Sequence, residues 1–177
     1  MDPPPRRIFT GRVVTLDVAE VTLPNGHVAE LEVVGHPGGA AIVAVNDAGA
    51  VCLLHQYRHV AGGWLWEIPA GKLDGRPPED VARSELREEA GRTAARWESL
   101  GRVLSSPGVF TEIVHLYLAR ELSEVPPQPE RDEVFEVSWV PLSSALARAL
   151  RGEIEDGKSV IALVRAAERL GLIADTT

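Results

Sequence analysis

The side chains best suited to chemistry in this sequence are three neighbouring glutamates, Glu85, Glu88 and Glu89. On an α-helix, with about 100° per residue, Glu85 and Glu89 lie one turn apart and Glu88 lies beside them. Carboxylate oxygens are the ligands that Mg²⁺ and Mn²⁺ prefer. The spacing leaves two interpretations open: a solvated acidic face, partly balanced by Arg83 and Arg87, or a divalent metal site.

The flanking residues predict the helix that carries these acids. Pro78 suits a first turn, where its missing N–H costs nothing, and the two acids after it favour the positive end of the helix dipole. Gly91 is a favourable stop. We therefore predict a helix over residues 78–90, with Leu86 on the apolar stripe that adjoins the acids.

Strand signals dominate the first third of the chain and return after this helix. The expected strands, alternating or β-branched in composition, cover residues 8–21, 27–34, 40–45, 50–59, 64–69, 97–105, 112–122 and 134–140. Helical spacing of apolar residues predicts two more helices, over 142–150 and 159–170, and residues 123–132 are expected to form a mobile acidic loop. This order predicts an α/β (α+β) fold, a mixed sheet with helices on its faces and a small separate N-terminal sheet.

Composition narrows the possible partners. The chain has 177 residues, 45% of them apolar, and its formal charge of -8 disfavours binding to a nucleic-acid backbone. A single cysteine, Cys52, excludes an internal disulfide framework and is interpreted as a small core residue. The N-terminus does not resemble a signal peptide, and no apolar run approaches the ~18 residues that span a bilayer. We expect a cytoplasmic protein with no nucleic-acid or membrane partner.

Residues 67–91 resemble the Nudix box, whose helical part reads Arg-Glu-U-x-Glu-Glu-x-Gly-U, where U is aliphatic. The matching positions are Gly71, Glu85, Leu86, Glu88, Glu89 and Gly91. The resemblance implies a Nudix fold and a metal-dependent hydrolase that cleaves a nucleoside diphosphate linked to another group. Glu85, Glu88 and Glu89 are then the expected ligands of Mg²⁺ or Mn²⁺, and the resemblance adds the backbone carbonyl of Ala70.

The sequence departs from the box at three positions. The segment between Gly71 and Glu85 is one residue short. With that gap, Arg76 stands where the pattern has its first glutamate, Ser84 where it has its arginine, and Arg92 at its last aliphatic position. The arginine matters most, because in the family it orients the helix carboxylates. These departures keep open a non-catalytic Nudix module that binds a nucleotide.

Segments outside the box look like the ADP-ribose pyrophosphatase branch of this family, notably residues 56–58, 64–71 and 106–108. This resemblance implies hydrolysis of ADP-ribose or a related nucleoside diphosphate sugar to AMP and ribose 5-phosphate, with GDP-mannose or another nucleotide sugar as the alternative. It further implies a homodimer that exchanges its N-terminal strands. We accordingly divide the chain into a strand extension, residues 1–38, and a Nudix domain, residues 39–177.

Hydrolysis also needs a base that reaches the attacking water. The branch places a functional acid near the end of the acidic loop, and Glu133 is the best positional match, with Asp132 and Glu130 as alternatives. An exposed acidic loop without chemistry is the competing interpretation. Glu88 is assigned to the catalytic group together with Glu133.

Three further residues are candidates for substrate contacts. Arg58 could pair with a phosphate through its planar fork, or form an ion pair at a strand end. Trp66 shares a strand face with Trp64 and could stack on a base or ribose, or pack in the core or a dimer contact. Pro107 matches a proline that the branch carries beyond the box.

Overall fold

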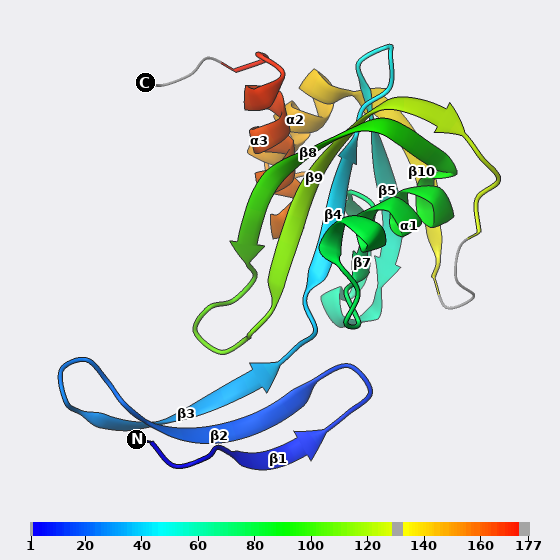
Figure 1. Ribbon diagram of the computed structural model, residues 1–177. Coiled ribbons are helices and arrows are strands. Elements are labelled where there is room, and N and C mark those ends of the chain that lie inside the picture. Colours follow the sequence, from blue (N-terminus) through cyan, green and yellow to red (C-terminus); the bar gives the residue numbers. More distant parts are fainter. Residues whose placement is uncertain (1, 129–132, 174–177) are drawn as a thin grey trace.

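The computed structural model describes residues 2–128 and 133–173 (Figure 1). The strands are β1 (Arg6–Thr10), β2 (Thr15–Thr22), β3 (Val28–Gly35), β4 (Gly39–Ala44), β5 (Ala50–Arg58), β6 (Gly63–Glu67), β7 (Ala70–Lys72), β8 (Arg92–Leu104), β9 (Ile113–Glu124) and β10 (Phe135–Pro141). The helices are α1 (Pro78–Ala90), α2 (Leu142–Leu150) and α3 (Gly157–Arg169), with a 3-10 turn η1 (His59–Ala61). None of the described helices combines the length and apolarity that a bilayer crossing requires.

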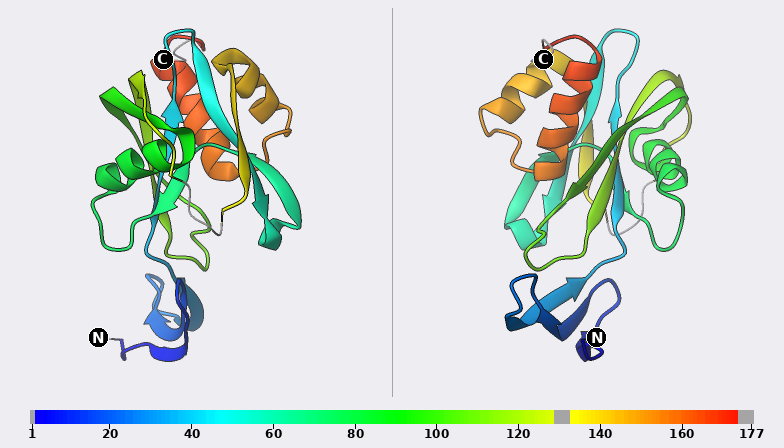
Figure 2. Two further views of the ribbon diagram at one scale, coloured as in Figure 1. Left: turned by 90° about the vertical axis from the view of Figure 1, so that its right-hand side faces the viewer. Right: turned by 60° about the vertical axis from the view of Figure 1, so that its left-hand side comes forward.

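The strands pair into three sheets. β1, β2 and β3 form one, and the orders β10-β5-β6 and β7-β4-β9-β8 form the other two. β4 runs parallel to β9, whereas β7 and β8 pair antiparallel, so this sheet is mixed. α1 lies on one side of the strands, and α2 and α3 lie on the other (Figures 1 and 2). The predicted α/β class is confirmed, although the strands of the body divide into two sheets where one was expected.

β4 is the central strand of the body and is buried on both faces. Ala41 and Val43 belong to the core that includes α2 and α3, while Ala40 and Ile42 belong to the core beneath α1. This alternation follows from the two-residue period of a strand, and burial on both faces explains why β4 carries only small and apolar residues. α1 is thereby fixed on the sheet through Leu86, which is fully buried.

The N-terminal sheet stands apart from the body in all views (Figures 1 and 2). Several of its large apolar side chains are exposed, among them Phe9 at 55% and Val28 at 53%. It joins the body through Val34, which exchanges backbone hydrogen bonds with Val109 and Thr111 at 2.7 and 2.9 Å. A three-stranded sheet with so little buried surface is marginal as an independent unit.

The structure confirms the predicted helix over residues 78–90 and its stop at Gly91, which has a φ of 60° in the left-handed region. The strand predicted over 8–21 is wrong in its middle. A tight turn, in which the N–H of Gly11 donates to the carbonyl of Val14, divides it into β1 and β2.

Two other differences concern strand ends. β8 begins at Arg92 rather than at residue 97, because it pairs with β9 from its first residue onward. β7 was not predicted, since three residues are too few to show a strand period. The first two residues of the predicted acidic loop belong to β9, and residues 129–132 lie outside the described residues.

Candidate functional site

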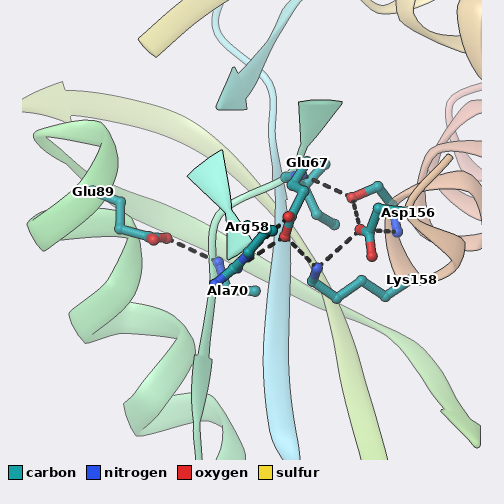
Figure 3. A network of polar contacts seen from close by, with 8 residues as sticks. Arg58, Glu67, Ala70, Glu89, Asp156 and Lys158 are labelled. Carbon is teal, nitrogen blue, oxygen red and sulfur yellow. Dashed lines mark hydrogen bonds and ion pairs between the residues drawn. The ribbon is translucent and has the colours of Figure 1, made fainter. Parts of the chain in front are cut away.

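The acids of α1 lie along one edge of the helix, beside its buried stripe. Glu89 is only 2% exposed, and Glu85 and Glu88 are half-buried. The Glu89 carboxylate accepts a hydrogen bond from the backbone N–H of Ala70, with an N···O distance of 2.9 Å (Figure 3). Because Ala70 is the first residue of β7, this bond ties the acidic edge of α1 to that strand.

Gly71 brings the backbone of β7 against the same edge. A Cβ atom at this position would lie 1.7 Å from Oε1 of Glu85, so a larger residue would displace the Glu85 side chain from its place against β7. The close approach of the Glu85 carboxylate to β7 therefore depends on glycine at this position. Glu85, Glu89 and the β7 backbone form one unit, which we name the acidic edge.

The surroundings of Glu89 disfavour its charged form. Burial raises the pKa of Glu89 well above its ordinary value, and the charges of Glu85 and Glu133 raise it further. The Ala70 N–H and the charge of Arg58 act in the opposite direction without reversing the shift. A buried carboxylate flanked by other acids is typical of a site that awaits a cation.

The donor chemistry of the acidic edge fits a hard divalent cation. Within residues 2–128 and 133–173, no three side chains of His, Cys, Asp or Glu lie close enough to hold a metal by themselves. Mg²⁺ usually takes one or two protein carboxylates and completes its shell with water and substrate phosphates. The structure brings Glu85, Glu89 and Ala70 together in that manner. Glu88 lies on the same helix, and its backbone carbonyl accepts the N–H of Gln128 at 3.1 Å.

A second buried carboxylate, Glu67 at the end of β6, lies near the acidic edge and is fully balanced (Figure 3). Arg58, at the end of β5, donates from Nε and Nη2 to its two oxygens at 2.8 and 3.0 Å. Lys158, in the first turn of α3, donates to Oε2 at 2.7 Å. Burial opposes ionisation of Glu67, yet the hydrogen bonds from Arg58 and Lys158 keep its pKa below the ordinary value.

Arg58 therefore forms an ion pair at a strand end, one of the two roles that its sequence position allowed. Its side chain is still 42% exposed, although its partner Glu67 is buried. Its charge also lowers the pKa of Glu89, so its field reaches the acidic edge. Contact between Arg58 and a substrate phosphate stays a prediction.

The other predicted substrate residues lie elsewhere in the body. Trp66 stacks on His55, with ring centroids 4.5 Å apart, and the Arg148 guanidinium lies 4.4 Å from the same ring. Pro107 is exposed in the loop between β8 and β9, whose backbone pairs with Val34. Their substrate contacts stay predictions.

The predicted base lies just before β10. Glu133 is half-buried, and its charge raises the pKa of Glu89, which shows that the two carboxylates interact. The alternatives Glu130 and Asp132 lie outside the described residues. Cys52 is fully buried, which confirms its interpretation as a core residue, and burial raises the pKa of its thiol to about 12, so the thiol is unreactive.

Two of the residues that depart from the box, Arg76 in the loop and Ser84 on the helix, contact each other. Nη2 of Arg76 donates to Oγ of Ser84 at 2.6 Å and to the carbonyl of Asp80 at 3.3 Å. The bond connects the loop after β7 with the middle of α1. Arg92, the third departure, pairs at the start of β8 with Glu124 at 2.8 Å.

Sequence reasoning missed Glu67 and Lys158. One signal was present: Glu67 is an acid inside a short apolar segment, and a buried acid needs a cation. Another was Asp156, a good N-cap residue, whose carboxylate accepts the N–H of Ser159 at 3.1 Å and thereby begins α3. Neither signal identifies the partner, because Lys158 is far from Glu67 in the sequence.

An acidic helix edge held against a short strand, on a mixed sheet between helices, is an arrangement that can bind a divalent cation together with substrate phosphates, as a metal-assisted hydrolase of phosphate compounds requires. Comparison with known proteins agrees: residues 35–164 match the model of the NUDIX domain. The chain belongs to the Nudix family and is a Nudix hydrolase.

Relatives and solved structures share most of its length. It is 41% identical over 160 residues to the ADP-ribose pyrophosphatase of Bacillus subtilis, covering 89% of this chain and 86% of that protein. It is 42% identical over 151 residues to the ADP-ribose pyrophosphatase of Mycobacterium tuberculosis, covering 83% and 73%. A solved structure described as an ADP compounds hydrolase superposes with a TM-score of 0.83 at 20% identity, covering 97% of this chain and 94% of that one, and supports the fold.

Proposed function

We propose that this protein hydrolyses the pyrophosphate bond of ADP-ribose, giving AMP and ribose 5-phosphate, with Mg²⁺ or Mn²⁺ as its cofactor. The observation that carries the proposal is Glu89, a buried carboxylate with a raised pKa that is held between Ala70 and Glu85. Two relatives at 41% and 42% identity, each named ADP-ribose pyrophosphatase, support the substrate.

The positions of the residues support the roles that we propose for them. Glu85, Glu89 and the Ala70 carbonyl, with Glu88 beside them, would hold the cation, which when bound neutralises phosphate oxygens and activates water. We assign Glu133 as the base that accepts the proton of the attacking water, and its electrostatic interaction with Glu89 supports this role.

On the substrate side, the exposed part of Arg58 would bind a phosphate oxygen. We retain Trp66 as a candidate for stacking on the base or ribose, and Pro107 as a candidate contact in the loop after β8.

The assembly that we propose is a cytoplasmic homodimer. In it the strand extension of one chain, residues 1–38, packs against the other chain. The exposed apolar side chains of the N-terminal sheet support it, because Ile8, Phe9 and Leu31 are 46%, 55% and 42% exposed. Light scattering after chromatography tests the assembly. Phe9→Asp should release monomers, and a monomeric wild type would contradict the dimer.

The activity is tested with a panel of ADP-ribose, GDP-mannose and other nucleotide sugars, assayed with and without Mg²⁺ or Mn²⁺. Products are identified by chromatography. We expect AMP and ribose 5-phosphate to form from ADP-ribose only when metal is present. We also expect ADP-ribose to be hydrolysed faster than GDP-mannose. Nucleotide binding without any release of AMP would instead support the non-catalytic module.

A further inference from the structure

The N-terminus of α3 is joined to the segment that leads into the acidic edge. Ser159 is fully buried, and its Oγ accepts the backbone N–H of Ile68 at 2.9 Å. Its own hydroxyl and N–H donate to the Asp156 carboxylate, which caps α3. Ile68 follows Glu67 and precedes Ala70 by two residues, so α3 contacts this segment from the side opposite to α1 (Figure 3).

Lys158 adds charge to the same junction. Its Nζ donates to Glu67 at 2.7 Å and to Asp156 at 2.9 Å, and its side chain is 18% exposed. Burial opposes the charged form, but the two carboxylates raise its pKa above the ordinary value. Lys158 is therefore a cation that links Asp156, the N-cap of α3, to Glu67, the ion-pair partner of Arg58.

The Glu67 carboxylate is shared unequally. Within the part of the chain that the structure describes, Oε1 accepts from Arg58 alone, whereas Oε2 accepts from both Arg58 and Lys158. The second donor restricts rotation of the carboxylate and thus fixes the plane of the Arg58 fork. Among the described residues Nη1 of Arg58 has no hydrogen-bond partner, and 42% of the side chain is exposed.

We propose that Lys158 is a positioning residue for substrate: by anchoring Glu67 to α3, it orients Arg58 so that its unused guanidinium edge binds a phosphate of the nucleoside diphosphate. This inference rests on the proposed function, since it assigns the oriented arginine to that substrate. A clamp that only fastens α3 to the body is the competing role.

The two roles give different results in a double-mutant cycle. The variants are Lys158→Met, Arg58→Gln and the double variant, with Lys158→Arg as the conservative replacement. Arg169→Met is the matched control, because Arg169 also lies on α3 and its contact is with Glu98 at 3.5 Å. Calorimetry measures the Kd of an ADP-ribose analogue with a methylene bridge between its phosphates, in the presence of Mg²⁺, and ADP-ribose turnover gives KM and kcat.

If Lys158 acts through Arg58, Lys158→Met raises Kd and KM about tenfold, the size expected for one charge-assisted hydrogen bond, while kcat changes less than about twofold. Lys158→Arg restores most of the affinity. In the Arg58→Gln background the same change adds less than about twofold. Equal losses in both backgrounds, or an unchanged Kd with a lower melting temperature, would overturn the proposal.

The design separates this inference from the proposed function. Release of AMP by the wild type tests the function alone, whereas analogue binding tests the positioning without any turnover. A wild type that binds the analogue with the predicted cycle but releases no AMP would refute hydrolysis and support the role of Lys158. If the wild type releases AMP but the losses of affinity from Lys158→Met and Arg58→Gln are additive, hydrolysis is supported and the positioning role of Lys158 is refuted.

Discussion

Glu67 and Glu89 are two buried carboxylates with the same exposure and opposite surroundings. Each is 2% exposed. Glu67 is contacted by Arg58 and Lys158 at 2.7 to 3.0 Å, whereas Glu89 receives one backbone N–H and lies beside a second acid. Burial disfavours both anions, but hydrogen bonds lower the pKa of Glu67, while burial and Glu85 raise that of Glu89.

The difference shows how one chain separates a structural carboxylate from a ligand. Burying a charge is unfavourable unless it is paired, so each carboxylate needs a cation. The fold supplies two cations to Glu67, which leaves little room for an external ion. At Glu89 the described residues supply the Ala70 N–H and the field of Arg58, and we propose that a bound cation supplies the balancing charge.

The largest effect is expected where the external cation binds. Glu89→Gln keeps the side-chain shape and can still accept the Ala70 N–H, but it removes the charge that we propose holds the metal. We expect kcat/KM for metal-dependent AMP release to fall about 1000-fold, or about 4 kcal/mol of transition-state stabilisation. Glu168→Gln, at an exposed position on α3, is the control. If the variant kept a tenth of the wild-type activity, Glu89 could not be a metal ligand.

The balanced carboxylate should respond in stability. Glu67→Gln leaves Arg58 and Lys158 without their shared anion, and unfolding free energy should fall by about 2 to 3 kcal/mol, below the full range for buried pairs because Arg58 is partly exposed. Urea unfolding measures this loss.

A matched exposed pair provides the control for that substitution. Glu124 accepts from Arg92 at 2.8 Å, the distance found for Arg58 and Glu67, but its side chain is 83% exposed. Glu124→Gln should change stability by less than about 1 kcal/mol. Equal losses at Glu67 and Glu124 would mean that burial does not distinguish the two pairs.

The two regions also differ in how far the sequence reveals them. The helix over residues 78–90 and the edge that carries Glu85 and Glu89 follow from local spacing, because helix geometry alone decides which residues share a face. The partner of Glu67 does not, since Lys158 is 91 positions away and only the packing of α3 brings it there. β7 was not predicted for a related reason. Its three residues form a strand because they pair with β4, and that pairing depends on the tertiary fold.

A smaller effect is expected on the pH dependence of the metal-free protein. The folded pKa of Glu89 lies above its ordinary value of 4.5, so the folded state binds more protons than the unfolded state just above pH 4.5. Stability should therefore fall as pH rises from 4.5 through the raised pKa. Glu67 has the opposite sign: its contribution is present above pH 4.5 and is lost as pH falls through its lowered pKa.

Glu89→Gln should remove that slope. Without metal at pH 7, we expect it to stabilise the fold by about 1 kcal/mol, or about 2 to 4 °C in Tm, because an unbalanced buried charge is gone. Calorimetry of chelator-treated protein at pH 5 and pH 7 measures both effects. Added Mg²⁺ should stabilise the wild type and not the variant. A lower Tm for the variant would show that the chain itself balances Glu89.

The smallest change is expected at Ser84, where the box pattern has an arginine. Arg76 already places a guanidinium against this position, donating to Ser84 Oγ at 2.6 Å. Ser84→Arg sets two like charges together, so turnover of ADP-ribose should change less than about threefold, and downward. Arg76→Glu combined with Ser84→Arg puts an acid and an arginine where the pattern has them, and it should recover the wild-type kcat/KM. A tenfold gain in turnover from Ser84→Arg alone would mean that the acidic edge needs a positively charged side chain at position 84, which Arg76 does not replace. The contrast between a balanced Glu67 and an open Glu89 would then no longer explain the site.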